Sequence, residues 1–229
     1  TTITSWLLSL TGIQGSSFIL KMLKPSSFSP ILAIVGIIFI MFTKDEKKKD
    51  IGGIFLGFAI LMYGMEAMSG AVAPLADNEK FTGILTMFSN PILGLLAGTI
   101  LTAVIQSSSA SVGILQALCA TGAVNFSTAL PIIMGQNIGT CVTAIISSIG
   151  TSKNAKRAAA VHLFFNISGT VIFMVVFYTL NTFVHFSFLN TAASPAGIAV
   201  IHSLFNIGAT ILLFPFANLL EKMAILAIP

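Results

Sequence analysis

The stretch Gln106–Ser111 decides the fold: it reads Gln-Ser-Ser-Ser-Ala-Ser and separates two apolar segments, Pro91–Ile105 and Val112–Ala120. About thirty residues further on, Gly135–Thr140 reads Gly-Gln-Asn-Ile-Gly-Thr and interrupts another apolar run. Hydroxyl and carboxamide groups at membrane depth are costly unless they are satisfied, so they usually serve a function there. Two such interruptions in neighbouring segments predict discontinuous helices around an ion or solute site.

The composition around these motifs is that of an integral membrane protein. The chain has 229 residues, of which 55% are hydrophobic and 8% are charged, whereas soluble domains average about 25% charged residues. That length allows several membrane spans of about 20 residues each. We therefore predict an all-α, multi-pass protein in the lipid bilayer of a cell membrane. The charged residues behind the net charge of +4 are concentrated in a few loops. The charge therefore bears on orientation in the membrane, and we expect no nucleic-acid partner.

Charged stretches divide the chain into predicted elements. Residues 44–50 form a basic loop, and Lys153, Lys156 and Arg157 form a second one. Because Lys and Arg prefer cytoplasmic loops, we expect both loops to be cytoplasmic. The other predicted elements are a span at 51–73, a re-entrant hairpin at 91–121, a broken crossing helix at 126–149, and spans at 158–180 and 196–219.

Two decapeptides near the carboxyl end repeat each other, with His, Phe, Asn, Ile and Thr in the same register. In each copy the His and the Asn lie at i and i+4, on one face of a helix. These polar pairs could line a pathway, or they could form hydrogen bonds between helices, as polar residues in membranes commonly do. We favour the second interpretation. The pairs are His162 with Asn166 and His202 with Asn206.

A fainter repeat relates Thr1–Leu10 to Thr140–Ile149. Thr1 and Thr4 align with Thr140 and Thr143. The predicted topology leaves the two segments ending on opposite sides of the membrane. Equivalent segments of opposite orientation are characteristic of an inverted repeat, and many secondary transporters contain one.

These motifs resemble the sodium/phosphate cotransporter type II family, and its bacterial branch most closely. The resemblance is carried by residues 102–111, 114–118 and 135–143. It implies two inverted halves, each with a Gln-Ser-Ser-Ser hairpin followed by a broken helix, in the bacterial inner membrane or plasma membrane. Residues 51–229 would be the second repeat, and residues 1–43 the end of the first. Because only one Gln-Ser-Ser-Ser occurs here, we expect a missing first-half segment or a second copy of the chain to supply the rest.

The family resemblance and the physics of helix ends together predict a site for phosphate and Na⁺. Helix amino termini and hydroxyl groups can bind an anion without arginine, and side-chain oxygens suit Na⁺. Glu66, well inside a predicted span, is a candidate for ion coupling. The alternative is that these polar residues only cap and pack helices. The predicted phosphate ligands are Gln106, Ser107, Ser108 and Ser109, and the predicted sodium ligands are Gln106, Gln136, Asn137, Thr140, Thr143, Thr1 and Thr4.

The leading hypothesis is a secondary transporter that couples Na⁺ movement to uptake of inorganic phosphate, with Na⁺ as coupling ion and no other metal or cofactor. A carrier or channel for another oxyanion is the nearest alternative. A third is a membrane subunit that does not transport and needs a partner chain. We expect no enzymatic activity, because no His, Cys and carboxylate cluster has metal-ligand spacing and no serine has a base beside it.

Overall fold

The computed structural model describes residues 1–10, 25–75 and 78–229, and the regular elements in these ranges are helices. Residues 11–24 of the predicted first-repeat segment lie outside the described residues. The α-helices are α1 (Thr2–Ser9), α3 (Pro25–Phe42), α4 (Glu46–Val72), α5 (Glu79–Met87), α6 (Pro91–Ile105), α7 (Ser108–Ala120), α8 (Phe126–Ser147), α9 (Lys153–Val184), α10 (Pro195–Leu213) and α11 (Ala217–Ala227). Short 3-10 turns η2 (Ala73–Leu75), η3 (Ser187–Asn190) and η4 (Phe214–Phe216) join some of them.

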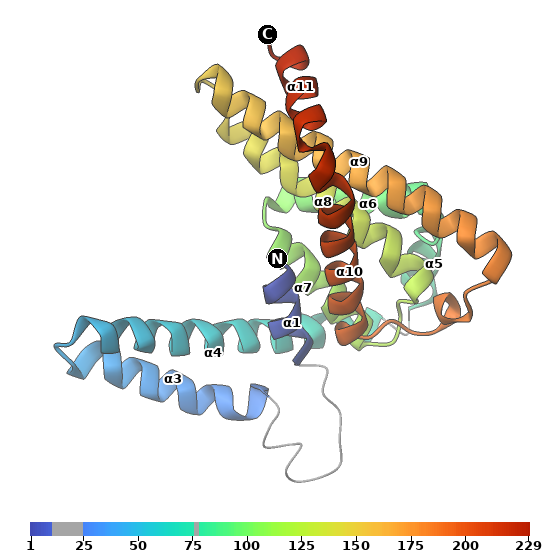
Figure 1. Cartoon of the computed structure of the whole chain (residues 1–229). Coiled ribbons are helices and arrows are strands. Elements are labelled where there is room, and N and C mark those ends of the chain that lie inside the picture. Colours follow the sequence, from blue (N-terminus) through green and yellow to red (C-terminus); the bar gives the residue numbers. More distant parts are fainter. Residues whose placement is uncertain (11–24, 76–77) are drawn as a thin grey trace.

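The helices form a bundle with one projecting pair (Figure 1). Helices α3 and α4 lie side by side and extend away from the rest, while α7, α8 and α10 form the centre. The short α1 lies against α7 and α10. A core cluster of Leu8, Met62, Met65 and Ala117 joins α1 and α4 to α7. Apolar packing therefore holds α1 beside the serine-rich part of the chain.

Four helical stretches in the described part of the chain are long and apolar enough to cross a membrane, which confirms an all-α membrane protein. These helices differ in burial. Of the 18-residue apolar stretch within α8, 61% is buried, whereas only 17% of the corresponding stretch of α9 is buried. Helix α8 is therefore central, and α9 presents most of its apolar surface outward. The four stretches are Glu46–Ala71, Phe126–Ser147, Lys153–Val184 and Pro195–Ala227. The last combines α10, η4 and α11, so the predicted span at 196–219 is longer and includes a 3-10 turn.

The segment predicted as a re-entrant hairpin, 91–121, forms two short helices with a turn between them, and its re-entrant course in the membrane stays a prediction. Helix α6 begins at Pro91, and the Asn90 side chain caps it by accepting hydrogen bonds from the N–H groups of Ile92 and Leu93. This is the position that proline favours in a helix. Helix α6 ends at Gln106, and α7 begins at Ser108 after a single intervening residue.

The predicted break in the crossing at 126–149 is wrong, because α8 runs without interruption from Phe126 to Ser147. Two polar side chains in this stretch bond to carbonyl groups of their own helix. Asn137 Nδ2 donates to the Ile133 carbonyl at 2.9 Å, and Thr140 Oγ1 donates to the Asn137 carbonyl at 2.6 Å. The motif that predicted a break therefore lies within a continuous helix.

The glycines of this motif allow close packing of α8 against α6. A Cβ atom at Gly135 would lie 2.0 Å from the Leu95 carbonyl oxygen, and one at Gly139 would lie 2.6 Å from the Thr99 carbonyl oxygen. Thr99 Oγ1 also donates to the Gly135 carbonyl at 3.1 Å. Only glycine permits such backbone contact.

Both predicted basic loops are largely helical, which corrects the boundaries of the neighbouring spans. In the predicted loop 44–50, Asp45 accepts a hydrogen bond from the Lys47 N–H and caps α4, which begins at Glu46. Ser152 caps α9 in the same way, so Lys153 already belongs to that helix. Acceptor side chains at these caps satisfy the otherwise unpaired N–H groups, which lets each helix begin within its charged stretch.

Candidate functional site

The turn between α6 and α7 presents hydrogen-bond donors. Gln106 ends α6 in the left-handed conformation, with φ at 55°. Ser107 caps α7, and its Oγ accepts a hydrogen bond from the Ala110 N–H at 3.3 Å. The N–H groups of Ser108 and Ser109 lie in the first turn of α7, where the helix offers no carbonyl partner and its dipole is positive. A helix amino terminus of this kind suits an anion, and phosphate binding at this tip stays a prediction.

The first residues of the chain lie directly against this tip. The Thr1 and Ser108 hydroxyl groups are hydrogen-bonded to each other. One helical turn further along α1, Ser109 Oγ donates to Thr4 Oγ1 at 3.4 Å. Two predicted groups of ligands that are more than 100 residues apart in sequence are thus adjacent in space. Whether they bind ions stays a prediction.

A buried glutamine holds α1 in this position. Gln116 of α7 is fully buried, and its Nε2 donates to the Ser5 carbonyl at 2.9 Å and to the Pro195 carbonyl at 2.8 Å. It therefore joins α7, α1 and α10. Trp6 Nε1 adds a hydrogen bond to Ser203 Oγ at 2.8 Å. The position of α1 against the serine tip is thus determined by polar contacts as well as by apolar packing.

A polar cavity of about 340 Å³ lies where α1, α7, α8, α9 and α10 meet. It contains no charged side chain among the described residues that line it, and its polar groups are hydroxyls, carboxamides and imidazoles. Four of the predicted ligands line it: Thr1, Ser108, Asn137 and Thr140. The other lining residues are Thr2, His162, Phe165, Asn166, His202 and Asn206.

The other six predicted ligands do not line the cavity. Ser107, Ser109 and Thr4 lie at the hairpin tip and its contact with α1. Gln106 and Thr143 are exposed and do not line the cavity. Gln136 is buried and faces α7, where its Nε2 donates to the Ser111 carbonyl at 3.0 Å and to Ser111 Oγ at 2.9 Å. Ser111 Oγ in turn accepts a hydrogen bond from Thr102 Oγ1 of α6 at 2.7 Å. In this structure Gln136 fixes the hairpin to α8 and does not face the cavity.

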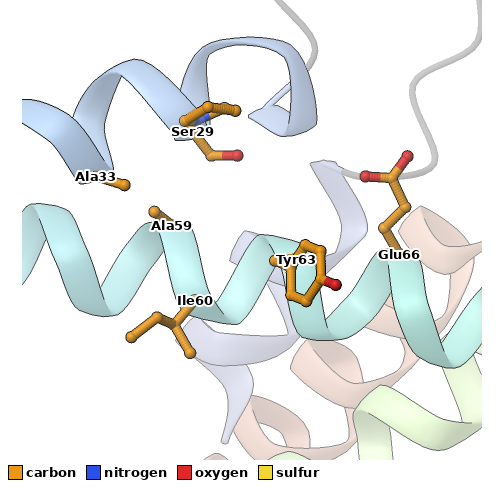
Figure 2. A pocket seen from close by; sticks show the side chains of 7 residues that line it. Ser29, Ala33, Ala59, Ile60, Tyr63 and Glu66 are labelled. Atoms are coloured by element: carbon orange, nitrogen blue, oxygen red, sulfur yellow. The ribbon is translucent and has the colours of Figure 1, made fainter.

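Glu66 lies apart from this cavity. It lines a separate cleft of about 290 Å³ between α3 and α4, together with Tyr63 and Ser29. Figure 2 shows Ala33 and Ala59 facing each other across the cleft, with Glu66 toward one end of it. Its role in ion coupling stays a prediction, and the structure does not bring it to the predicted phosphate and sodium ligands.

The two His/Asn pairs are the functional candidates that sequence reasoning assigned to packing. Helix–helix hydrogen bonding is present for both of them, since Thr2 Oγ1 lies 3.0 Å from His202 Nδ1 and Cys141 Sγ of α8 donates to the His162 carbonyl of α9 at 3.6 Å. Both pairs nevertheless line the cavity. The signal that could have identified them was the repeated decapeptide, because a repeat of polar residues at one register places equivalent groups on neighbouring helices.

The cavity is lined by neutral oxygen and nitrogen donors and by two histidines. Among residues 1–10, 25–75 and 78–229, no group of three or more His, Cys, Asp and Glu side chains could hold a metal ion. The cavity offers neutral oxygen atoms from hydroxyls and carboxamides, which suit alkali cations, and donors near the α7 amino terminus, which suit an oxyanion.

Comparison with known proteins finds one matching family model and several similar proteins. The family model described as Na⁺/Pi-cotransporter matches residues 1–70 and 60–205. "Uncharacterized protein YqeW" of Bacillus subtilis is 30% identical over 201 residues, which are 87% of this chain and 64% of that protein. "Putative inorganic phosphate export protein YjbB" of Escherichia coli is 25% identical over 196 residues, 84% of this chain and 35% of that protein.

A mammalian relative covers a shorter segment. "Sodium-dependent phosphate transport protein 2A" of Rattus norvegicus is 39% identical over 113 residues, 47% of this chain and 17% of that protein. The chain therefore spans less than two thirds of the length of each of these relatives. No solved structure matches it significantly. Since the family model covers most of the chain, the chain belongs to the Na⁺/Pi-cotransporter family.

Proposed function

We propose that this member of the Na⁺/Pi-cotransporter family transports inorganic phosphate together with Na⁺, and that the α7 amino terminus and the adjoining cavity form the substrate site. The observation that carries the proposal is the contact of Thr1 with Ser108 at the edge of a polar cavity. It joins the hairpin tip to a segment that resembles part of the opposite repeat. Binding sites in inverted-repeat carriers lie at such junctions.

The anion would be bound through hydrogen bonds. The N–H groups of Ser108 and Ser109 and their hydroxyls are donors at the positive end of the α7 dipole. No lysine or arginine is among the residues that line the cavity. A phosphate in this position would therefore keep most of its negative charge without a fixed positive partner.

This charge imbalance favours coupling to cations. Burying an uncompensated anion away from water is strongly unfavourable. Na⁺ ions bound to neighbouring oxygens would compensate the charge and then move with the phosphate. Hydroxyls of Thr1 and Thr140 and the carboxamide of Asn137 supply such oxygens at the cavity. Coupled binding of phosphate and Na⁺ is therefore the physical basis that we propose for symport.

The direction of net transport is a separate question. Relatives carry names for sodium-dependent phosphate transport and for phosphate export. In a carrier that couples both solutes, the direction follows from the two gradients, and an inward Na⁺ gradient would drive phosphate uptake. We therefore expect uptake at the cell membrane under ordinary Na⁺ gradients, with efflux when the phosphate gradient is steep and outward.

The test is uptake of radioactive phosphate into proteoliposomes that contain the purified protein. An inward Na⁺ gradient should drive uptake, whereas an equal K⁺ gradient should not. The double variant Ser108→Ala/Ser109→Ala should lose this uptake, while Ser148→Ala, whose hydroxyl bonds within its own helix, should keep it. Sulfate and arsenate in excess should be included, because hydroxyl donors accept other oxyanions. Uptake that is independent of Na⁺, or that survives the double variant, would contradict the proposal.

A further inference from the structure

A second polar cavity lies near the carboxyl end of α9, away from the substrate site proposed above. Its volume is about 320 Å³, and it lies between the start of α8, the end of α9 and the loop that carries η3. Among the described residues, it shares no lining residue with the cavity beside the α7 amino terminus. Tyr178, which lines it, follows Asn166 by twelve residues on α9, which corresponds to roughly 18 Å along the helix axis. It is named here the Tyr178 cavity.

The loop that forms one wall of the Tyr178 cavity is fixed at both of its ends. Toward its end, the Thr191 carbonyl accepts a hydrogen bond from the Phe126 N–H of α8 at 3.1 Å. At its start, the Phe186 ring stacks on the Phe177 ring of α9, with the ring centroids 5.4 Å apart. These contacts do not involve a ligand. The cavity is therefore formed in advance, as small-molecule sites usually are.

The end of α9 determines the orientation of one carboxamide in the lining. His185 ends the helix in the left-handed conformation, with φ at 52°, and its N–H donates to the Asn181 carbonyl at 2.9 Å. The next N–H, that of Phe186, donates to the side-chain Oδ1 of Asn181 at 2.9 Å. An NH₂ group cannot accept a hydrogen bond, so the atom that faces the Phe186 N–H must be the oxygen. The Asn181 Nδ2 carries the two donors of this carboxamide and lies on the side away from that bond.

The hydroxyl of Tyr178 is buried and has no hydrogen-bond partner in the described part of the chain. Such groups are rare in folded proteins, because the loss of hydration is uncompensated. Packing accounts for the Tyr178 ring, whose centroid lies 5.3 Å from that of Phe177. A phenylalanine would pack equally well, so packing does not account for the hydroxyl. This O–H group indicates a hydrogen-bond acceptor in the cavity that Tyr178 lines.

We propose that the Tyr178 cavity binds a phosphate group, through the hydroxyls of Tyr178 and Ser127 and the Nδ2 of Asn181. These groups are donors, and no carboxylate is among the described residues that line the cavity, so an oxyanion fits better than a cation. His185 and Asn190, which also line it, are exposed. A bound phosphate would therefore keep part of its hydration and would not need a fixed cation. The proposal goes beyond the proposed function, because it concerns a separate site and does not require transport.

Two sources can present this phosphate group. One is inorganic phosphate, and the other is the headgroup of a phospholipid. Phe183 and Val184 are 79% and 59% exposed, so apolar surface suited to acyl chains adjoins the end of α9. Both sources offer the same anionic oxygens to the same donors, and the test has one arm for each of them.

The test uses the two tyrosines of the chain, Tyr63 and Tyr178. Purified protein labelled with 3-fluorotyrosine should give two ¹⁹F NMR resonances, which Tyr63→Phe assigns. If free phosphate is the occupant, inorganic phosphate should shift the Tyr178 resonance saturably in detergent, and chloride at equal ionic strength should not. Tyr63, in the cleft between α3 and α4, is the internal control in this arm. If a headgroup is the occupant, the Tyr178 resonance should differ between nanodiscs of phosphatidylglycerol and of a phosphate-free glycolipid, without added phosphate.

Asn181→Asp removes the donor and keeps the helix end intact. The aspartate retains an oxygen for the Phe186 N–H, but it replaces Nδ2 with an oxygen and adds a negative charge that repels phosphate. The half-saturating phosphate concentration should therefore rise by about tenfold or more, and the lipid-dependent difference should vanish. Thr182→Asp is the matched control, because it adds the same charge at the next residue, which is outside the lining and bonds locally to the Thr179 carbonyl. It should change both responses far less.

The double variant Ser108→Ala/Ser109→Ala separates this site from the proposed substrate site, and its Tyr178 resonance should respond as in wild type. Loss of the response in this variant would show that Tyr178 reports the substrate site, and would overturn the proposal. A Tyr178 resonance that responds to neither phosphate nor lipid, or that responds equally in Asn181→Asp and Thr182→Asp, would also overturn it. Na⁺-driven phosphate uptake without any Tyr178 response would support the proposed function and contradict this site. A Tyr178 response in a protein that does not transport phosphate would do the reverse.

Discussion

A Cβ atom at Gly98 of α6 would lie 2.1 Å from the carbonyl oxygen of Ile132 in α8. The two helices are thus in backbone contact, and the hairpin has no freedom to shift toward α8. This contact sets the position of the hairpin tip, because α6 leads directly into Gln106 and Ser107. The substrate site that we propose therefore depends on backbone packing at Gly98, which precedes Ser108 by ten residues.

Gly98→Ala should therefore destabilise the protein by about 1–3 kcal/mol, the usual cost of overpacking a core. Gly53→Ala is the matched control, since a Cβ at Gly53 meets nothing within 4 Å and alanine is the better helix former. Its stability should be unchanged or slightly higher. Thermal unfolding in detergent measures both. Equal stability of Gly98→Ala and wild type would show that α6 and α8 are not in backbone contact.

Gln136 should be energetically coupled to Ser111. The two residues share two hydrogen bonds across the α7–α8 contact, and buried networks of this kind show coupling of about 0.5–3 kcal/mol. A double-mutant cycle with Gln136→Leu and Ser111→Ala measures it. The Ser111 carbonyl remains in both variants, so the cycle reports the side-chain bond. Additive effects would show that the side chains of Gln136 and Ser111 are not hydrogen-bonded.

Loss of the Gln116 carboxamide should release α1 from the hairpin. Gln116→Leu leaves the Ser5 and Pro195 carbonyls without this donor, which costs about 1–3 kcal/mol. The expected result is faster proteolysis near the amino end, with the α6–α8 contact preserved. Thr121→Val, which breaks only two local bonds at the end of α7, to the Leu118 carbonyl and from the Ala123 N–H, serves as the control. Unchanged proteolysis would contradict the three-helix contact.

Both basic stretches should face the cytoplasm, because Lys and Arg are retained there during insertion. Single cysteines at Lys48 and Asn154 test this with a membrane-impermeant thiol reagent. The native Cys119 and Cys141 are buried, so they should add little background. We expect labelling in inverted vesicles and protection in intact cells. Labelling of both positions in intact cells would reverse the orientation, and labelling of one alone would change the number of crossings.

The sequence predicted the hairpin well because its signals are local. Pro91 after Asn90 starts a helix, and Ser107 after a polar residue caps the next one, through contacts between residues adjacent in sequence. The same local reasoning failed at Gly135–Gly139. Glycines indicate either a break or close packing, and only the distance to α6 decides between them.

The cavity could be predicted only in part. Ser108, Asn137 and Thr140 were identified from their motifs, and Thr1 from a weak repeat. Asn166 and Asn206 were assigned to packing because sequence does not reveal which helices surround the cavity. Gln136 was taken for a ligand because its position in a polar motif says nothing about which neighbouring helix it faces.

The most direct test of coupled binding is the affinity for phosphate as a function of Na⁺ concentration, measured by equilibrium binding to the purified protein. If Na⁺ compensates the charge of a phosphate at the α7 amino terminus, the Kd for phosphate should fall as Na⁺ rises. By linkage, phosphate should tighten Na⁺ binding by the same factor. We predict this reciprocal effect in Na⁺ and not in choline. A phosphate Kd that is the same in both salts, at equal ionic strength, would contradict the account.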